Sequence, residues 1–123
     1  MPGLKAELGE RGDPLYQDDD VEVFILPSGE TAPLQLAVNA LGTRSDDFGN
    51  DKEWRAAAHQ RENGWSVEIA IPYEIVGMTG PPAPGTVLSA QFGRQQKPKP
   101  ETTAWAQTTA FRNTDRFGDL VVE

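Results

Sequence analysis

Apolar and polar residues alternate along several short stretches of the chain, as they do in β-strands with one buried face. One such stretch covers residues 20–26 and ends at a Pro-Ser-Gly turn. The next covers residues 34–40 and is closed by Gly42. The short connection between the two stretches predicts an antiparallel hairpin.

A second hairpin is predicted further along the chain. Residues 54–60 and 65–71 are strand-like and flank Glu-Asn-Gly, and Asn-Gly between two such runs is a strong hairpin signal. Further strands are expected at 86–94, near 104–107 and near 117–122. About six or seven short strands separated by turns predict an all-β fold, an antiparallel β-sandwich of the immunoglobulin or jelly-roll kind.

The length fits one domain. At 123 residues the chain is long enough for one core and leaves little room for a second. Residues 1–13 carry no clear pattern and form an N-terminal segment without an assigned element, while residues 14–123 form the predicted sandwich domain.

Charge and composition exclude several classes of function. The chain has 11 basic and 19 acidic residues, a net charge of −8, which argues against nucleic acid and anionic membranes as partners. No apolar run approaches the roughly 18 residues of a membrane-spanning helix, and no signal peptide is predicted at the start. The chain has no cysteine, which excludes disulfides, cysteine-ligated zinc and thiol catalysis.

Strand alternation predicts a polar face opposite the core. Val21, Val23 and Ile25, with the equivalent residues of the other strands, are expected in the core. The opposite face would then carry a row of carboxylates and amides: Glu22, Asn39, Glu68, Ser89 and Gln91. Such a row suits sugar hydroxyls, because it offers acceptors and donors at fixed spacing. Alternation by itself favours an ordinary solvated face, which most antiparallel sheets possess.

Aromatic residues add a second signal, because a sugar presents an apolar C–H face on which a ring can stack. Tyr16 and Phe111 lie in polar or turn-rich segments, so they are the candidates for exposed stacking platforms. Trp54 and Trp65 are expected to pack in the core or within the hairpin.

Three segments of the chain carry a family resemblance. They are Asp-Asp-Asp-Val-Glu-Val-Phe within residues 16–25, Asn-Gly-Trp-Ser-Val-Glu-Ile-Ala-Ile-Pro at 63–72, and Asp-Arg-Phe-Gly-Asp-Leu within 111–120. In this order they resemble the carbohydrate-binding modules of family nine, which belong to the DOMON-like β-sandwich superfamily.

The resemblance implies a module that holds a sugar between two aromatic rings, with calcium in a structural role. By position, Tyr16 and Phe111 would be the two rings, Glu22 would hydrogen-bond sugar hydroxyls, and Asn39 would lie in the corresponding polar strand position. Family habit also implies an extracellular or periplasmic location.

The sequence departs from the family pattern at the sugar contacts. Tyr16 and Phe111 stand where the sugar-binding prototype has tryptophans, Ala37 where it has an arginine, and Thr108 and Thr109 where amide side chains are expected. Family domains also have further strands before the Val-Glu motif. The chain is therefore expected to be a fragment, to have a reduced sandwich, or to be completed by a second copy or a partner chain.

Acidic runs offer the hard oxygen ligands that calcium prefers. The candidate ligands are Asp18, Asp19, Asp46 and Asp47. No loop shows a full ligand spacing, and acidic runs are more often solvated surface.

Three other functions stay open at this point. A haem-binding domain of the same superfamily would have to use His59 with Met1 or Met78, which makes haem the less favoured cofactor. A glycosidase would use Glu22 and Glu68 as its acid and base. A structural or protein-interaction module would have no sugar site. The sequence favours a non-catalytic module that binds carbohydrate through aromatic stacking and polar contacts.

Overall fold

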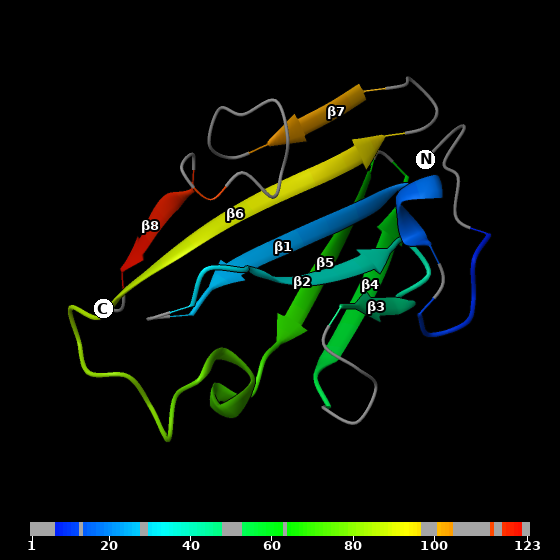
Figure 1. Cartoon of the computed structure of the whole chain (residues 1–123). Helices are drawn as coiled ribbons and strands as arrows, with labels where there is room; N and C mark the ends of the chain where they lie inside the picture. The colour runs from blue at the N-terminus through cyan, green and yellow to red at the C-terminus, as the bar shows by residue number, and fades with distance from the viewer. Residues whose placement is uncertain are drawn as a thin grey trace.

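The chain folds into two antiparallel sheets, shown in a computed structural model in Figure 1. The structure describes residues 7–12, 14–27, 30–47, 53–62, 64–96, 101–104, 114 and 117–121. The larger sheet has the order β3-β2-β1-β6-β7, with β8 also paired to β6. Its strands are β1 (Asp20–Leu26), β2 (Leu34–Asn39), β3 (Arg44–Asp46), β6 (Val87–Gln96), β7 (Glu101–Ala104) and β8 (Gly118–Val121).

The smaller sheet is the hairpin of β4 (Arg55–Arg61) and β5 (Gly64–Ala70). Two short 3-10 helices complete the described elements, η1 (Leu15–Gln17) and η2 (Tyr73–Val76). Pro72 stands immediately before η2, as the helical-turn pattern there suggests. The predicted all-β antiparallel sandwich is confirmed.

The core lies between the two sheets. Val23 of β1 is opposite Leu36 of β2 and Phe92 of β6, so the three side chains share the face that looks toward the hairpin. The buried core cluster consists of Val23, Ile25, Leu36, Val38, Trp54, Ile75 and Val76. The alternation in residues 20–26 and 34–40 therefore identified the inner face correctly.

Two sequence-based boundaries were wrong. The sequence analysis predicts no strand between residues 40 and 54, but Arg44–Asp46 pairs with β2 as strand β3. The strand predicted at 86–94 ends too early, because β6 continues to Gln96, and the strand predicted near 104–107 starts too late, because β7 begins at Glu101. Strands β3 and β7 lie at the two edges of the larger sheet. They form by pairing with a neighbouring strand and not through an apolar alternation in their own sequence.

Part of the outer face of the larger sheet is buried as well. Glu22, Phe24 and Gln91 all lie on this face and are buried. An N-terminal segment is fixed to its margin by hydrogen bonds from two neighbouring side chains. The Asn39 amide donates to the Leu8 carbonyl at 2.7 Å and to Asp18 Oδ2 at 3.1 Å. The same Asp18 oxygen accepts the backbone N–H groups of Glu7 and Leu8, each at 2.9 Å.

Trp54 joins the two sheets where the chain enters β4. Its side chain is 1% exposed, its indole N–H donates to Asp46 Oδ2 at 2.9 Å, and the Arg44 guanidinium lies 5.6 Å from its ring centre. Arg44 also donates to the Trp54 carbonyl. Trp54 is thus a core residue, as expected from the sequence.

Arg11 links the N-terminal segment to this corner. It donates to Asp46 at 3.4 Å and to Glu53 at 2.8 Å. The hydrogen bond from Arg11, and then its positive charge, lower the pKa of Glu53. Glu53 is exposed, so the ion pair is screened by water and adds little to stability by itself.

Replacing Trp54 tests this junction. Trp54→Ala is expected to lower the free energy of unfolding by about 3–5 kcal/mol, because it leaves a cavity between the sheets. Trp54→Phe keeps most of the packing but removes a donor from a buried carboxylate, at a cost of about 1–3 kcal/mol. Urea denaturation followed by circular dichroism measures both. Trp65→Ala is the matched control, since Trp65 is only half-buried, and an equal loss for Trp65→Ala and Trp54→Ala would contradict this role.

Candidate functional site

A hollow of about 270 Å³ lies beside η1 at the outer face of the larger sheet. We call it the Tyr16 hollow. It is lined by Gly12, Pro14, Leu15, Tyr16, Glu22, Gln35, Ala37, Ser45, Asp46 and Asp47. The residues come from the chain before β1, including η1, from β1 and β2, and from β3 with the residue that follows it. Three separate parts of the chain therefore meet at one concave surface.

Tyr16 is the aromatic residue of this hollow. The 3-10 turn after Pro14 buries Leu15 and leaves Tyr16 55% exposed. The turn is closed by the backbone N–H of Gln17, which donates to the Pro14 carbonyl at 3.1 Å. A buried leucine thus holds an exposed ring beside the sheet.

Glu22 and Gln35 form the polar side of the hollow. Glu22 is only 5% exposed, and Gln35 Nε2 donates to Glu22 Oε1 at 3.0 Å. Ala37 is directly opposite Glu22 in the strand pairing. The sequence analysis did not identify Gln35, although its alternation with Leu34 and Leu36 places it on the same face.

Asp46 and Asp47 line the same hollow but play different parts. The side chain of Asp46 is completely buried, and its Oδ2 accepts the Trp54 and Arg11 hydrogen bonds. Asp47 is exposed, and its Oδ1 accepts the backbone N–H of Gln35 at 2.9 Å. These contacts fix the β3 side of the hollow.

The predicted calcium ligands are not gathered into a metal site. Asp18 and Asp19 are buried, and Asp18 uses one oxygen to hold the N-terminal segment. In the part of the chain that the structure describes, no three acidic or histidine side chains are grouped so that they could hold an ion. Calcium therefore stays a prediction from the family resemblance.

Asn39 and Gln91 share the outer face with Glu22 but do not line the hollow. Besides its bonds to Leu8 and Asp18, Asn39 accepts the backbone N–H groups of Leu41 and Thr43, each at 3.0 Å. Its amide is thus used on both sides to hold the chain around the end of β2. Gln91 is completely buried, and its Oε1 accepts the backbone N–H of Phe92 at 3.1 Å.

The prediction that Glu68 shares a polar face with Glu22 is wrong. Glu68 is opposite Ala57 in the hairpin and is exposed, while its neighbours Val67 and Ile69 pack against the core. Glu22 and Glu68 therefore lie on the outer faces of two different sheets, with the core between them. Packed sheets are about 10 Å apart, so these two carboxylates cannot act as the acid and base of a glycosidase.

The haem alternative does not fit the described residues either. His59 is exposed on β4, and by alternation its side chain is on the outer face of the hairpin. Met78 packs against the core cluster instead. Met1 and the second predicted ring, Phe111, lie outside the described residues, as do Thr108 and Thr109.

None of the described helical segments is long and apolar enough to cross a membrane.

Comparison with known proteins gives structural matches and no sequence matches. No known family matches the sequence, and no curated protein does. The fold is similar to a family nine carbohydrate-binding module from Caldicellulosiruptor kristjanssonii solved in complex with glucose, with a TM-score of 0.75 and 19% identity. It is equally similar to that module in complex with cellotriose, with a TM-score of 0.76 and 19% identity.

The matches cover 98% of this chain and 65% or 64% of the module. The chain thus spans slightly less than two thirds of the length of the protein it matches. The shared part includes the two sheets that enclose the core. The chain has the β-sandwich fold of a family nine carbohydrate-binding module.

Proposed function

We propose that the chain is a non-catalytic carbohydrate-binding module that binds a sugar unit in the Tyr16 hollow. The observation that carries the proposal is the position of an exposed tyrosine ring, 55% accessible, in the same hollow as the buried pair of Glu22 and Gln35. A sugar needs this combination, because its C–H face stacks on a ring while its hydroxyl edge requires donors and acceptors.

The size and chemistry of the hollow support a small ligand. Its volume of about 270 Å³ is just below the range of roughly 300–1,000 Å³ typical of sites for larger organic ligands, so a single sugar unit is the natural occupant. Glu22 and Asp47 supply acceptors for hydroxyl protons, and the Gln35 amide is polar at both ends. Ala37 leaves the floor of the hollow open.

The rest of the proposal follows from the family resemblance. Phe111 is proposed as the second ring because of its position in the family resemblance. Among the described residues that line the hollow, Tyr16 is the one with an aromatic side chain. The fold matches are consistent with a binding role, because the module they match is solved with glucose and with cellotriose. An extracellular or periplasmic location stays a prediction.

Removing the ring is the first test. Tyr16→Ala is expected to weaken binding of glucose or cellotriose by about 2- to 10-fold, in line with roughly 0.5–1.5 kcal/mol for a ring contact. Isothermal titration calorimetry measures the affinity. Tyr73→Ala is the matched control, because Tyr73 is another exposed tyrosine, on η2. If the two variants bind sugar equally well, the ring of Tyr16 is not the platform.

Neutralising Glu22 is the second test. Glu22→Gln keeps the shape of the side chain but removes its charge, and hydrogen bonds to charged groups contribute about 1.5–3 kcal/mol. Sugar affinity is expected to fall by about 10- to 100-fold, while Glu68→Gln leaves it unchanged. Cellotriose recovered intact after incubation with the parent chain would agree with a non-catalytic role, whereas its hydrolysis would contradict that role.

Structural calcium remains a separate prediction, because it came from the resemblance and the described residues give it no site. If an ion is bound elsewhere in the chain, chelation is expected to lower the thermal midpoint and added calcium to restore it. Thermal melting with calcium and again with chelator tests the stability, and a glycan array run under the same two conditions tests the binding. Identical melting curves would remove calcium from the proposal, and no sugar binding by a folded sample would favour a protein-interaction module.

A further inference from the structure

Every charged side chain among the described residues that line the Tyr16 hollow is acidic. The three carboxylates are those of Glu22, Asp46 and Asp47, and the other lining residues are uncharged. Glu22 belongs to β1, Asp46 ends β3 and Asp47 follows it. The fold therefore gathers negative charge from two parts of the chain, and this charge bears on the kind of sugar that the hollow accepts.

Asp46 has a cation as its partner inside the protein, since its Oδ2 lies 3.4 Å from the Arg11 guanidinium. Glu22 and Asp47 both accept hydrogen bonds from Gln35. The Gln35 side-chain amide donates to Glu22 at 3.0 Å, and the Gln35 backbone N–H donates to Asp47 at 2.9 Å. Because an amide is neutral, these two bonds leave the charge of both carboxylates in place.

The two described arginines at this corner do not line the hollow. Arg44 precedes Ser45, which lines it, but successive residues of a strand point to opposite faces of a sheet. The Arg44 guanidinium accordingly lies toward the core, 5.6 Å from the centre of the Trp54 ring. Arg11 donates to Glu53 at 2.8 Å. Both cations thus stabilise the junction around Trp54.

The direct cross-strand neighbours of Glu22 are uncharged. They are Ala37 on β2 and Gly93 on β6. A lysine or arginine at either position would balance the carboxylate across the sheet, whereas alanine and glycine do not. Glu22 is only 5% exposed, so water solvates little of its charge. A cationic ligand group therefore compensates this charge better than a hydroxyl does.

Tyr16 adds a surface that also attracts a cation. Its ring is exposed and lines the same hollow, and the face of an aromatic ring carries the negative part of its quadrupole. An ammonium group over such a face is attracted to it. A neutral sugar stacks on the ring as well, so it is the ring together with the carboxylates that favours a positively charged sugar.

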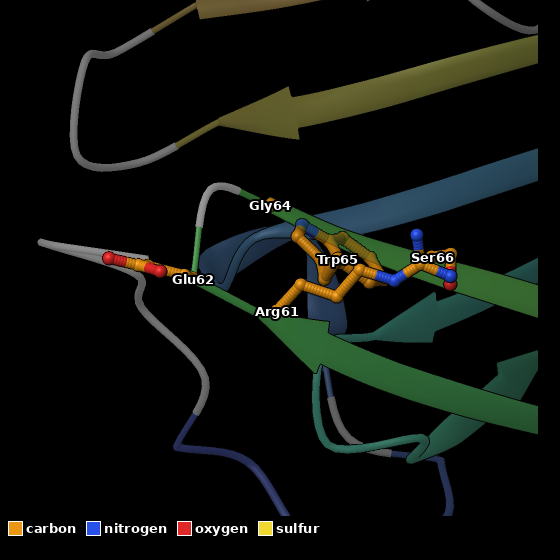
Figure 2. Close-up of a pocket in the computed structure, with 5 residues that line it drawn as sticks. All are labelled: Arg61, Glu62, Gly64, Trp65 and Ser66. Atoms are coloured by element: carbon orange, nitrogen blue, oxygen red, sulfur yellow. The ribbon is translucent and has the colours of Figure 1, made fainter.

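A hollow at the β4–β5 turn has a different character. About 420 Å³ of space is lined there by Arg61, Glu62, Gly64, Trp65 and Ser66. Figure 2 shows the Arg61 side chain extending toward Ser66, while Glu62 points away from both. A cation thus lines this space, although the whole chain carries a net charge of −8. The acidic lining is therefore a property of the Tyr16 hollow and does not follow from the composition alone.

We infer, on the basis of the proposed function, that the Tyr16 hollow selects an amino sugar, a hexose unit in which a protonated primary amine replaces a hydroxyl group. The ammonium group donates to the Glu22 carboxylate, and the C–H face of the sugar stacks on Tyr16. Asp47 adds its charge from the exposed side of the hollow. The same carboxylates repel a uronic acid, and N-acetylation of the amine removes the charge that is selected.

Matched ligands test this selectivity on the whole 123-residue chain. Glucosamine differs from glucose in one group, and the β-1,4-linked trimer of glucosamine differs from cellotriose in the same way. At mildly acidic pH, where these amines are protonated, each amino sugar is expected to bind about 5- to 10-fold tighter than its neutral counterpart, since a charge-assisted hydrogen bond is roughly twice as strong as a neutral one. N-acetylglucosamine is expected to lose this advantage, and glucuronic acid to bind more weakly than glucose. Isothermal titration calorimetry measures each affinity.

Two variants locate the charge that selects the amine. The quantity to compare is the affinity for glucosamine divided by that for glucose, because a general loss of affinity cancels in this ratio. Glu22→Gln is expected to lower the ratio about 3- to 5-fold and Asp47→Asn about two-fold. Glu62→Gln makes the same change in net charge at the other hollow and is expected to leave the ratio unchanged. Asp47 and Glu62 are exposed, so neither of these two variants disturbs the core.

Six basic residues lie outside the described residues: Lys5, Lys52, Lys97, Lys99, Arg112 and Arg116. The matched ligands report their effect as well, because a cation that any of them brought to the hollow would favour glucuronic acid over glucosamine. Butylamine completes the set, since it has the amine of a lysine side chain without a sugar ring. It is expected to bind more weakly than glucosamine.

Four results would overturn the inference. They are amino sugars that bind no tighter than their neutral counterparts, glucuronic acid as the tightest ligand, an affinity ratio that neither Glu22→Gln nor Asp47→Asn changes, and butylamine that binds as tightly as glucosamine. The last would assign the hollow to a basic side chain of a protein partner. The proposed function fails in a different way, when no sugar of the set binds to a folded sample.

Discussion

The indole N–H of Trp54 is buried where water cannot reach it, and this one donor sets the arrangement of a whole corner of the molecule. A buried indole needs an acceptor, and Asp46 supplies it. A completely buried carboxylate in turn needs a positive partner, and Arg11 supplies it from the N-terminal segment. The short strand β3 and the N-terminal segment are thereby held against the start of β4. Two sides of the Tyr16 hollow are built from these same segments, so the shape of the candidate site depends on a residue of the core.

A similar chain of requirements explains why part of the outer face of the larger sheet is buried although it is polar. Asn39 uses its amide to close the chain around the end of β2 and to hold Leu8 and Asp18. Asp18 then fixes the backbone of Glu7 and Leu8. Hydrogen bonds of this kind compensate the cost of removing polar groups from water. Polar residues on this face therefore contribute to the fold first, and Glu22 and Gln35 also line the Tyr16 hollow.

The sequence predicted the parts of the fold that local alternation determines. The inner faces of β1 and β2, the Asn-Gly hairpin and the exposure of Tyr16 all follow from residues within one element. Alternation could not tell that Glu68 belongs to the opposite sheet, because it gives the face of a strand and not the layer in which the strand lies. It could not find β3 either, since Arg44, Ser45 and Asp46 have no apolar member and form a strand only by pairing with β2. The bonds of Asn39 to backbone groups up to 31 residues away could not be predicted, because they have no local signal in the sequence.

The Tyr16 hollow joins segments that are held together elsewhere by only a few side chains. Tyr16 belongs to η1, Glu22 and Gln35 belong to the sheet, and Asp47 follows β3. A ligand that touches all of them is a non-covalent cross-link between these segments. The free energy of ligand binding would then add to that of the Asp18 and Arg11 contacts. Binding of the ligand and ordering of the chain before β1 would be coupled in one equilibrium. If the proposed sugar binds in this hollow, the ligand as well as the fold controls how well the chain before β1 resists proteolysis.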